Sequence, residues 1–341
     1  MPHLLAAPDK FKGTADAQDI AGAICAAAAS AGWSSESVPL ADGGEGTLDV
    51  LGGPNRRSRV SGPLGEPVEA EWRLDGDGAV IEMARASGLA LAGGPEANRP
   101  LEASTRGTGE LILAAVGGGA RRITVCVGGS ATTDGGWGAV EVLDGRLSGV
   151  DLVVACDVRT EFRRAAADFA GQKGATESEV TMLERRLDRL TQVYRDRYGV
   201  DVTGLPGAGA AGGLAGGLAA LGARLIPGFD LVADAVELDE RVARADLVVT
   251  GEGFLDEQSF EGKVVGGVAE LCAEAATPLL VVVGEVLAGV LGADLLPTGT
   301  EVVSLTETFG AEHSRTDPLN CIRTVVSRRL GPTSRNGRER E

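Results

Sequence analysis

The sequence predicts a two-domain α/β protein, with a doubly wound, Rossmann-like domain built from both chain ends and a second α/β domain inserted between them. Three observations lead to this prediction. Short apolar runs alternate with helical patterns at both ends of the chain, which is typical of a parallel sheet covered by helices. The middle of the chain contains a hairpin signal instead. The length of 341 residues also exceeds what a single hydrophobic core usually serves.

The expected domain borders follow from where these patterns change. We expect residues 1–55 and 240–330 to form the Rossmann-like domain, and residues 56–239 to form the inserted domain. Residues 331–341 are polar and are expected to be a disordered tail.

In chain order, the first expected element is a buried strand over residues 3–7. A helix over 15–31 follows, with Thr14 as its N-cap, and then a strand over 37–40. Residues 66–83 contain two β runs around an Asp-Gly-Asp-Gly turn signal at 75–78, which predicts a hairpin. Further strands are expected over 122–127, 151–155, 245–250, 278–283 and 301–305, and further helices over 108–116, 176–198 and 264–276.

Two segments of the middle region have distinct helical patterns. In residues 176–198, Thr176 and Glu179 have the spacing of a capping box. Leu183, Leu187, Leu190 and Val193 recur at helical spacing in the same segment and predict a core-facing stripe. The uncharged stretch 202–223 is long enough to span a bilayer, but it is crowded with glycine and has few bulky residues, so we expect a glycine-rich helix of a soluble protein.

Composition excludes several classes of function. The net charge of −17 disfavours partners such as nucleic acids and anionic membranes. The five cysteines are far apart, and no basic leader with a cleavage site is visible, so we expect a reducing, cytoplasmic location. Only two histidines are present, His3 and His313, which leaves too few donors for zinc or for histidine-based nucleophilic catalysis. Carboxylates, hydroxyls, ammonium groups and amides remain, and these suit Mg²⁺ and phosphoryl transfer.

The four lysines form the next signal, because the chain contains 28 arginines but only Lys10, Lys12, Lys173 and Lys263. All four lie in short polar or glycine-bearing segments. A compact ammonium group suits a phosphate as a point charge. We therefore interpret the set as candidate contacts to phosphate or to a carboxylate.

Glycine and aspartate gather in four loops that follow expected strands. In open α/β sheets, ligands bind at the carboxyl ends of strands, and glycine lets the backbone approach phosphate. Aspartates in such loops can hold Mg²⁺ or accept a hydroxyl proton. The loops are 9–13, 42–46, 128–136 and 251–258. Their candidate binding residues, in addition to the lysines, are Gly43, Gly44, Glu45, Gly129, Ser130, Thr132, Glu252 and Gln258.

A glycine pattern at Gly207, Gly209 and Gly212 matches a dinucleotide-binding fingerprint by its letters. It does not follow a convincing strand, so the match is weak. An NAD(P)-dependent oxidoreductase remains a remote alternative on this basis.

The motifs together resemble the type I glycerate kinase family. The segments that carry the resemblance are APDKFKG (6–13), PLADGGEGT (39–47), IEMARASGL (81–89), GTGELI (107–112), GGSATTDGG (128–136), ACDV (155–158), FAGQKGAT (169–176), GAGAAGG (207–213) and ADLVVTGEG (245–253). They occur in the family's order and cover roughly residues 3 to 325. The resemblance implies ATP-dependent, Mg²⁺-assisted phosphorylation of D-glycerate, with 2-phosphoglycerate expected rather than the 3-isomer.

On this reading the catalytic residues are Lys10, Asp42, Asp134 and Asp256, and the metal ligands are Asp42, Asp134 and Asp157. The division of base and metal roles among these carboxylates stays open, as does the choice between a monomer and a homodimer. The sequence departs from the family's usual residues at Thr133, at Phe254 and over 159–164. Because of these departures, one alternative stays open: a divergent member of the family that binds or phosphorylates another small hydroxy acid, or that is not catalytic.

Overall fold

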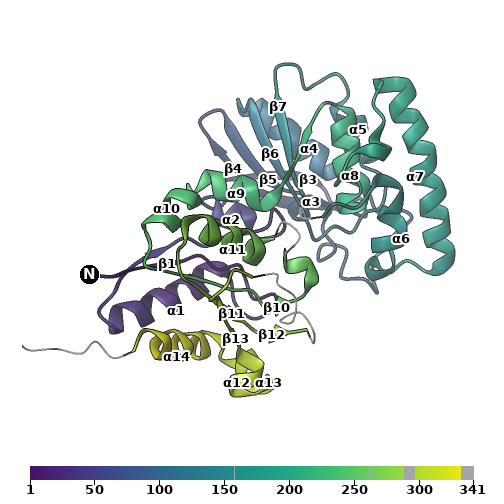
Figure 1. The fold of residues 1–341 in the computed structure, drawn as a ribbon. Coiled ribbons are helices and arrows are strands. Elements are labelled where there is room, and N and C mark those ends of the chain that lie inside the picture. The colour runs from purple at the N-terminus through teal and green to yellow at the C-terminus, as the bar shows by residue number, and fades with distance from the viewer. Residues whose placement is uncertain (157, 261–262, 288–295, 332–341) are drawn as a thin grey trace, which may run out of the picture. The chain divides into compact units, whose positions relative to one another are not determined.

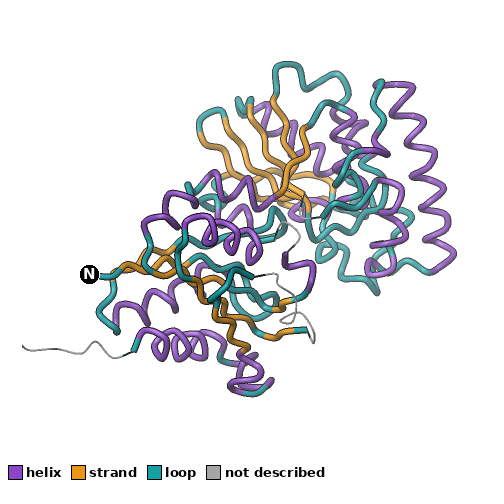
Figure 2. Tube along the Cα trace, in the orientation of Figure 1, coloured by secondary structure: helices purple, strands orange, loops and turns teal. Residues whose placement is uncertain are grey.

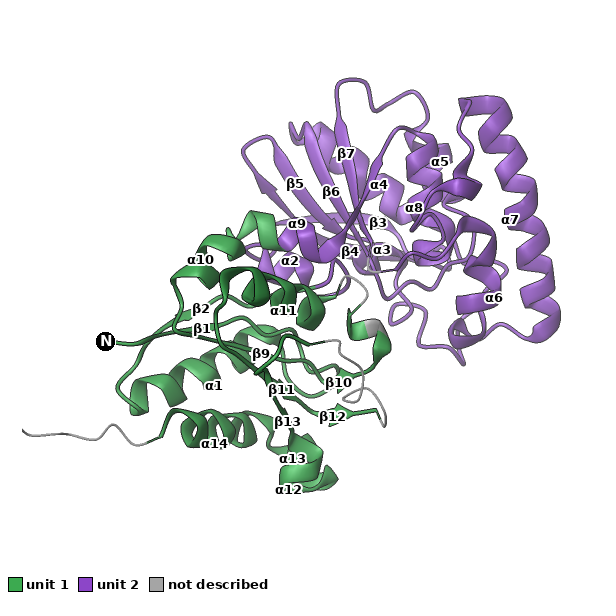
Figure 3. Cartoon of the chain, in the orientation of Figure 1, with its two compact units in different colours: residues 1–41, 233–341 green, residues 42–232 purple. Residues whose placement is uncertain are grey.

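The computed structural model describes residues 1–156, 158–260, 263–287 and 296–331. It confirms a mixed α/β architecture with parallel sheets (Figures 1 and 2). The chain divides into two compact units (Figure 3). We call residues 1–41 and 233–341 the terminal unit, and residues 42–232 the inserted unit.

The terminal unit is built on a five-stranded parallel sheet with the order β13-β11-β9-β1-β2. Its strands are β1 (His3–Ala6), β2 (Ser34–Ser37), β9 (Leu247–Thr250), β11 (Leu279–Val283) and β13 (Glu301–Ser304). Its helices are α1 (Ala17–Ser30), α10 (Leu238–Arg244), α11 (Val264–Ala275), α12 (Leu305–Phe309), α13 (Ala311–Thr316) and α14 (Pro318–Leu330). Two short strands, β10 (Phe254–Leu255) and β12 (Glu285–Val286), pair separately.

Helices cover both faces of this sheet, as the doubly wound prediction requires. Alternate strand residues such as Leu4 and Val282 pack with Ile20 and Ile24 of α1 and Ile322 of α14 in one core. Helices α10 and α11 lie on the opposite face (Figure 1). From β1 the chain continues through α1 to β2, and from β9 it continues through α11 to β11 on the other side. The neighbours β1 and β9 therefore form the point at which the strand order reverses, where ligands of such sheets bind.

The inserted unit contains a six-stranded mixed sheet with the order β3-β4-β5-β6-β7-β8. Its strands are β3 (Arg56–Ser61), β4 (Pro67–Asp75), β5 (Gly78–Glu82), β6 (Arg122–Val127), β7 (Asp151–Cys156) and β8 (Arg224–Pro227). β3 to β5 are antiparallel, with the predicted hairpin turn at 75–78, and β5 to β8 are parallel. Its helices are α2 (Thr47–Val50), α3 (Ala84–Ser87), α4 (Arg106–Gly117), α5 (Trp137–Leu143), α6 (Ala165–Phe169), α7 (Glu177–Tyr198) and α8 (Ala210–Ala220), and α9 (Gly228–Ala235) crosses the border of the unit.

The long helix α7 confirms the predicted cap and most of the predicted stripe. Thr176 and Glu179 form a reciprocal capping box, and Gly199 ends the helix in a left-handed conformation. Leu183, Leu187 and Leu190 are buried, whereas Val193 is only partly buried and Tyr194 takes the central place in the core. The predicted stripe is therefore confirmed for its three leucines, but its last buried residue is Tyr194 and not Val193.

Several expected boundaries were wrong for local reasons. Helix α1 is capped by Asp16, which accepts the amide of Asp19 at 2.7 Å, and not by Thr14, whose hydroxyl donates to the carbonyl of Phe11 at 2.9 Å. The second strand covers 34–37 and not 37–40, because β1 pairs with those four residues. The units divide the chain at 41/42 and 232/233, earlier than the expected borders at 55/56 and 239/240, because α2 and the loop before it pack against β5 and β6.

The glycine-rich stretch 202–223 contains helix α8, in which residues 211–213 are left-handed, so the regular part of the helix begins after Gly213. Residues 202–204, just before the candidate dinucleotide fingerprint, form a 3₁₀ turn and not a strand, which agrees with the weak interpretation of that motif. Within the described residues, no helix combines the length and the apolar character needed to cross a membrane. The expected tail is described only at Gly331, since 332–341 lie outside the described residues.

Candidate active site

In the terminal unit, two of the predicted loops meet where the strand order reverses. The amide of Asp9, after β1, donates to the carbonyl of Gly251, after β9, at 2.9 Å. A Cβ on Gly253 would lie 3.2 Å from the amide nitrogen of Lys12. At Gly251 a Cβ would lie 1.8 Å from the carbonyl oxygen of Val282, so only glycine fits there. Gly251 is therefore required by the neighbouring strand β11, and Gly253 lies at the close approach of the two loops.

The charged side chains of this cluster differ in exposure. Lys10 is half-buried and Lys12 is exposed. Lys263 occupies the N-cap position of α11 and is half-buried. Asp256 accepts the amide of Ser259 at 3.1 Å and so caps a short 3₁₀ turn over 257–260. Gln258 lies in that turn, but its side chain is outside the described part of the structure.

Glu252 is the most perturbed carboxyl group in this cluster. Burial raises the pKa of Glu252 to about 7, and the nearby carboxylates of Asp9 and Asp256 act in the same direction against Ser259 and Lys263. Its buried Oε1 atom has no hydrogen-bond partner among the described residues. A buried carboxyl oxygen without a hydrogen-bond donor lowers the stability of the fold. Such an oxygen can coordinate a cation or accept a hydrogen bond from a ligand.

In the inserted unit, the loop 42–46 lies against the end of β6. A Cβ on Gly128 would lie 2.8 Å from the Cα of Gly44, so position 128 requires glycine at this crossing. Asp42 is half-buried and accepts the amide of Gly44 through Oδ1 at 3.1 Å. A Cβ on Gly43 would lie 2.6 Å from the Cα of Gly228. The carboxylate of Glu45 faces Gly129, since a Cβ there would be 3.4 Å from Oε2.

Sequence reasoning missed Glu82, which anchors this loop. Glu82 is 1% exposed, and its Oε1 accepts the amides of Gly46 and Leu48 at 2.8 Å each. Arg85 contacts its other oxygen at 3.3 Å. A carboxylate at the first turn of α2 satisfies amides that have no partner within the helix. A lone acidic residue ending the apolar run of β5 was the signal that could have found it.

The loop 128–136 follows β6 and holds most of the predicted phosphate contacts of this unit. Ser130 forms an isolated bridge with Gly88, and its hydroxyl accepts a hydrogen bond from Lys173 at 2.7 Å. Thr132 is fully buried, and its hydroxyl donates to the carbonyl of Ala211 at 3.4 Å. A Cβ on Gly212 would lie 2.0 Å from the carbonyl oxygen of Thr132. The glycine turn before α8 thus supports this loop.

Asp134 has its carboxylate almost fully occupied by donors from the protein. Oδ2 accepts the amide and the hydroxyl of Thr105 at 2.8 Å each and the amide of Gly138 at 3.2 Å. Oδ1 accepts the amide of Gly136 at 3.0 Å. The residue is 7% exposed. This arrangement joins the start of α5 to the start of α4.

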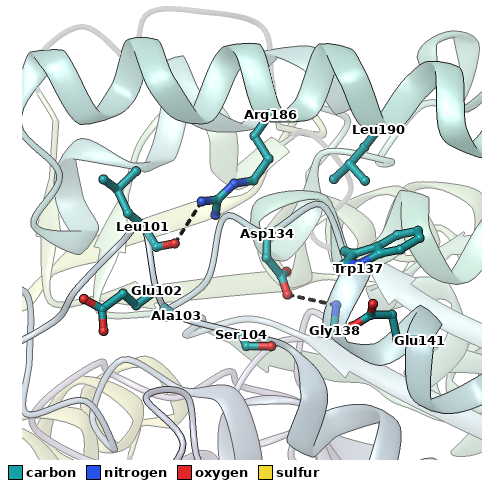
Figure 4. Close-up of a pocket in the computed structure, with 10 residues that line it drawn as sticks. All are labelled: Leu101, Glu102, Ala103, Ser104, Asp134, Trp137, Gly138, Glu141, Arg186 and Leu190. Carbon is teal, nitrogen blue, oxygen red and sulfur yellow. Dashed lines mark hydrogen bonds between the residues drawn. The ribbon is translucent and has the colours of Figure 1, made fainter.

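Asp134 also lines a cavity of about 300 Å³ beside α7 (Figure 4). The other lining residues are Leu101, Glu102, Ala103, Ser104, Trp137, Gly138, Glu141, Arg186 and Leu190. Arg186 donates across it to the carbonyl of Leu101 at 2.9 Å. The lining of the cavity is mixed: Trp137 and Leu190 are apolar, and Glu102, Glu141 and Arg186 are charged.

The predicted residues therefore fall into one cluster in each unit. Lys10, Lys12, Glu252, Asp256 and Lys263 gather at β1 and β9, while the loops 42–46 and 128–136 with Lys173 gather at β5 and β6. The predicted metal ligand Asp157 lies outside the described residues. In the part of the chain that the structure describes, no three His, Cys, Asp or Glu side chains are arranged to hold a metal ion by themselves.

The model of the glycerate kinase family matches residues 4–147 and 140–310. Glycerate 2-kinase of Escherichia coli K12 is 39% identical over 323 residues, which cover 82% of this chain and 84% of that protein. Glycerate kinase of Bacillus subtilis 168 is 39% identical over 83% of this chain and 85% of its own length.

A solved structure agrees with the same assignment. The crystal structure of a candidate glycerate kinase 2 from Salmonella typhimurium LT2 matches with a TM-score of 0.78 and 33% identity, covering 96% of this chain and 98% of that one. Sequence and fold thus agree over nearly the whole length. The chain is therefore an enzyme that belongs to the glycerate kinase family.

Proposed function

We propose that this enzyme transfers the γ-phosphoryl group of ATP to D-glycerate in the cytoplasm and forms 2-phosphoglycerate. The observation that carries the proposal is the glycine-lined approach of the Lys10–Lys12 loop and the Gly251–Gly253 loop where the strand order reverses. The names of the relatives support glycerate as the acceptor. Support for the 2-position comes from the E. coli relative, which is named a glycerate 2-kinase.

In this proposal the transfer is an in-line displacement. A glycerate hydroxyl oxygen forms a bond to the γ-phosphorus, the bond from that phosphorus to the β–γ bridging oxygen breaks, and ADP leaves. The hydroxyl proton passes to a carboxylate. Asp42 is our first candidate, because the amide of Gly44 is the one hydrogen-bond donor to it among the described residues. Asp256 is the second candidate, and the base role of Asp134 is disfavoured by its four donors.

Positive and polar groups then neutralise the phosphate and the glycerate carboxylate. Lys10, Lys12 and Lys263 supply charge, and the hydroxyl of Ser130 together with the amides of Ser130 and Thr132 supplies hydrogen-bond donors. Such groups act mainly through electrostatic stabilisation and positioning of the transferred group.

Mg²⁺ would neutralise charge that develops on the phosphate oxygens during transfer. In kinases it is usually held by one or two carboxylates together with substrate phosphates, so a three-carboxylate cage is not required. The unpartnered buried oxygen of Glu252 fits such a cation, and so does the half-buried carboxylate of Asp42. Each is a separate candidate for holding the ion, Glu252 in the terminal unit and Asp42 in the inserted unit, and Asp157 remains a prediction.

The test is ADP release by the purified protein with Mg-ATP and D-glycerate, with the product identified by NMR. We expect Asp42→Asn and Lys10→Ala each to lower turnover by on the order of 10²–10³ while the fold is retained. Asp246→Asn, on the other side of the terminal unit, serves as a matched control with unchanged turnover. Near-wild-type turnover of both site variants would refute the site assignment, and no ADP release above background by the wild type would favour a divergent member.

A further inference from the structure

Lys173 is the least accessible of the four lysines in the chain. It is 5% exposed, and its Nζ donates to the hydroxyl oxygen of Ser130 at 2.7 Å and to the carbonyl oxygen of Thr132 at 2.8 Å. Both acceptors belong to the loop that we propose as a phosphate cradle. A side chain so deeply buried, with its ammonium group bonded to the loop 128–136, is badly placed to contact a ligand.

The backbone around Lys173 is tied to the same loop a second time. The amide of the Asn98 side chain donates to the carbonyl of Ala131 at 3.0 Å and to the carbonyl of Lys173 at 2.8 Å. Gly174 has a φ of +92°, and a Cβ there would lie 2.0 Å from the carbonyl oxygen of Pro95. The lysine is thus held in place by backbone that cannot shift easily.

These bonds determine which way the loop's amides point. In a planar trans peptide the N–H group points opposite to the carbonyl of the same unit. The carbonyls of Gly129, Ala131 and Thr132 accept from Leu89, Asn98 and Lys173 respectively. The N–H groups of Ser130, Thr132 and Thr133 therefore point away from these partners, and none of them has an acceptor among the described residues.

The hydroxyl of Ser130 is directed in the same manner. An ammonium group has no lone pair, so Ser130 must be the acceptor in its bond to Lys173. Its own proton remains available to donate to another group. Among the described residues the loop therefore has one hydroxyl and three amides as unused donors close to a buried ammonium group, and such donors suit an anionic group.

We propose that Lys173 is a positioning residue, which fixes the loop 128–136 through Ser130 and Thr132 so that these donors meet a phosphate or carboxylate group without the lysine touching it. The inference rests on the proposed function for the identity of that anion. Burial lowers the pKa of Lys173 to about 7, with the carboxylate of Asp134 opposing the shift, so the cation is held at a cost to folding. A costly buried charge that makes no ligand contact is consistent with a role in arranging the loop.

The decisive experiment is a double-mutant cycle with Lys173→Met and Ser130→Ala. We expect Lys173→Met to lower kcat/KM by about 10–100-fold, the range for loss of a charge-assisted hydrogen bond. Its thermal midpoint should stay close to that of the wild type, because methionine replaces a desolvated cation by an apolar chain of similar length. If the lysine acts through Ser130, the double variant should lose little more than Lys173→Met alone.

The proposal would be overturned if the losses of kcat/KM in the two single variants added up in the double variant. It would also be overturned if kcat/KM fell only to the extent that the thermal midpoint fell. Arg164→Met, which removes an exposed cation in the neighbouring segment, is the matched control and should leave kcat/KM unchanged. Binding of tripolyphosphate, followed by calorimetry, separates this inference from the proposed function. About tenfold weaker binding by Lys173→Met would support the positioning role even if D-glycerate is not the acceptor, and equal binding would refute it.

Discussion

Asp134 provides the sharpest prediction, because sequence alone suggests a catalytic or metal-binding aspartate and the structure surrounds it with donors. Four hydrogen bonds reach its carboxylate, two from Thr105 and one each from Gly136 and Gly138. They connect the beginnings of two helices that pack on the central sheet. We therefore predict that its first role is to hold these helices together.

The size of the effect follows from those bonds. In Asp134→Ala, three buried amides lose their only acceptor, and removing one partner from a buried charged network typically costs about 3–5 kcal/mol. This is a large part of the roughly 5–15 kcal/mol that stabilises a typical domain. In Asp134→Asn, one carboxamide oxygen can keep the three bonds of Oδ2, while the new amino group faces the amide of Gly136, so we expect a loss of about 1–3 kcal/mol.

Urea denaturation followed by circular dichroism measures these losses, and ADP release measures activity on the same samples. Glu141→Ala removes another carboxylate that lines the same cavity and is exposed, so it should change stability by less than about 0.5 kcal/mol. The structural interpretation would be refuted by an Asp134→Asn protein as stable as the wild type with turnover reduced more than about a thousandfold. That outcome would instead identify Asp134 as a reacting group.

Two further predictions concern the terminal unit. The pKa of Glu252 is raised from 4.5 to about 7 in the folded protein, so its contribution to stability is fully present below pH 4.5 and is lost as the pH rises through about 7. Glu252→Gln should remove this part of the pH dependence in urea titrations without nucleotide or divalent cation, and identical pH profiles would contradict the assignment. Gly251→Ala places a methyl group 1.8 Å from a carbonyl oxygen and should destabilise by about 1–3 kcal/mol or more, whereas Gly171→Ala, with open space around it, should not.

Much of the fold could be predicted because its strands are short apolar runs with clear boundaries. The edge strands β3 and β8 could not. Arg56–Ser61 is mostly polar, Arg224–Pro227 is only four residues long and ends in proline, and the strand form of each depends on pairing with β4 or β7. The left-handed turn at 211–213 was also unpredictable. It is imposed by the close approach of Gly212 to Thr132, which is distant in sequence.

The sequence could predict which loops form the candidate site, but not the role of each residue in them. Glycine and aspartate after an apolar run indicate a strand-end loop whatever the partners are. The number of free lone pairs on Asp134, however, depends on Thr105 and on the start of α5, and the burial of Lys173 depends on Asn98. Such facts are tertiary, so a candidate residue in a binding loop can prove to be a support for that loop.

The pairing of the first strand with the ninth has a consequence for synthesis of the chain. Leu4 pairs with Leu247, so β1 has no partner on that side until more than 200 further residues have been made. At about 5–20 residues per second, this leaves β1 exposed on one edge for roughly 12–50 s, and residues 42–232 are made before that time ends. We expect ribosome-bound chains in which residue 232 has left the exit tunnel, but residue 247 has not, to protect the inserted unit from protease and to leave the first 41 residues open to cleavage. Protection of both segments at that length would contradict this order.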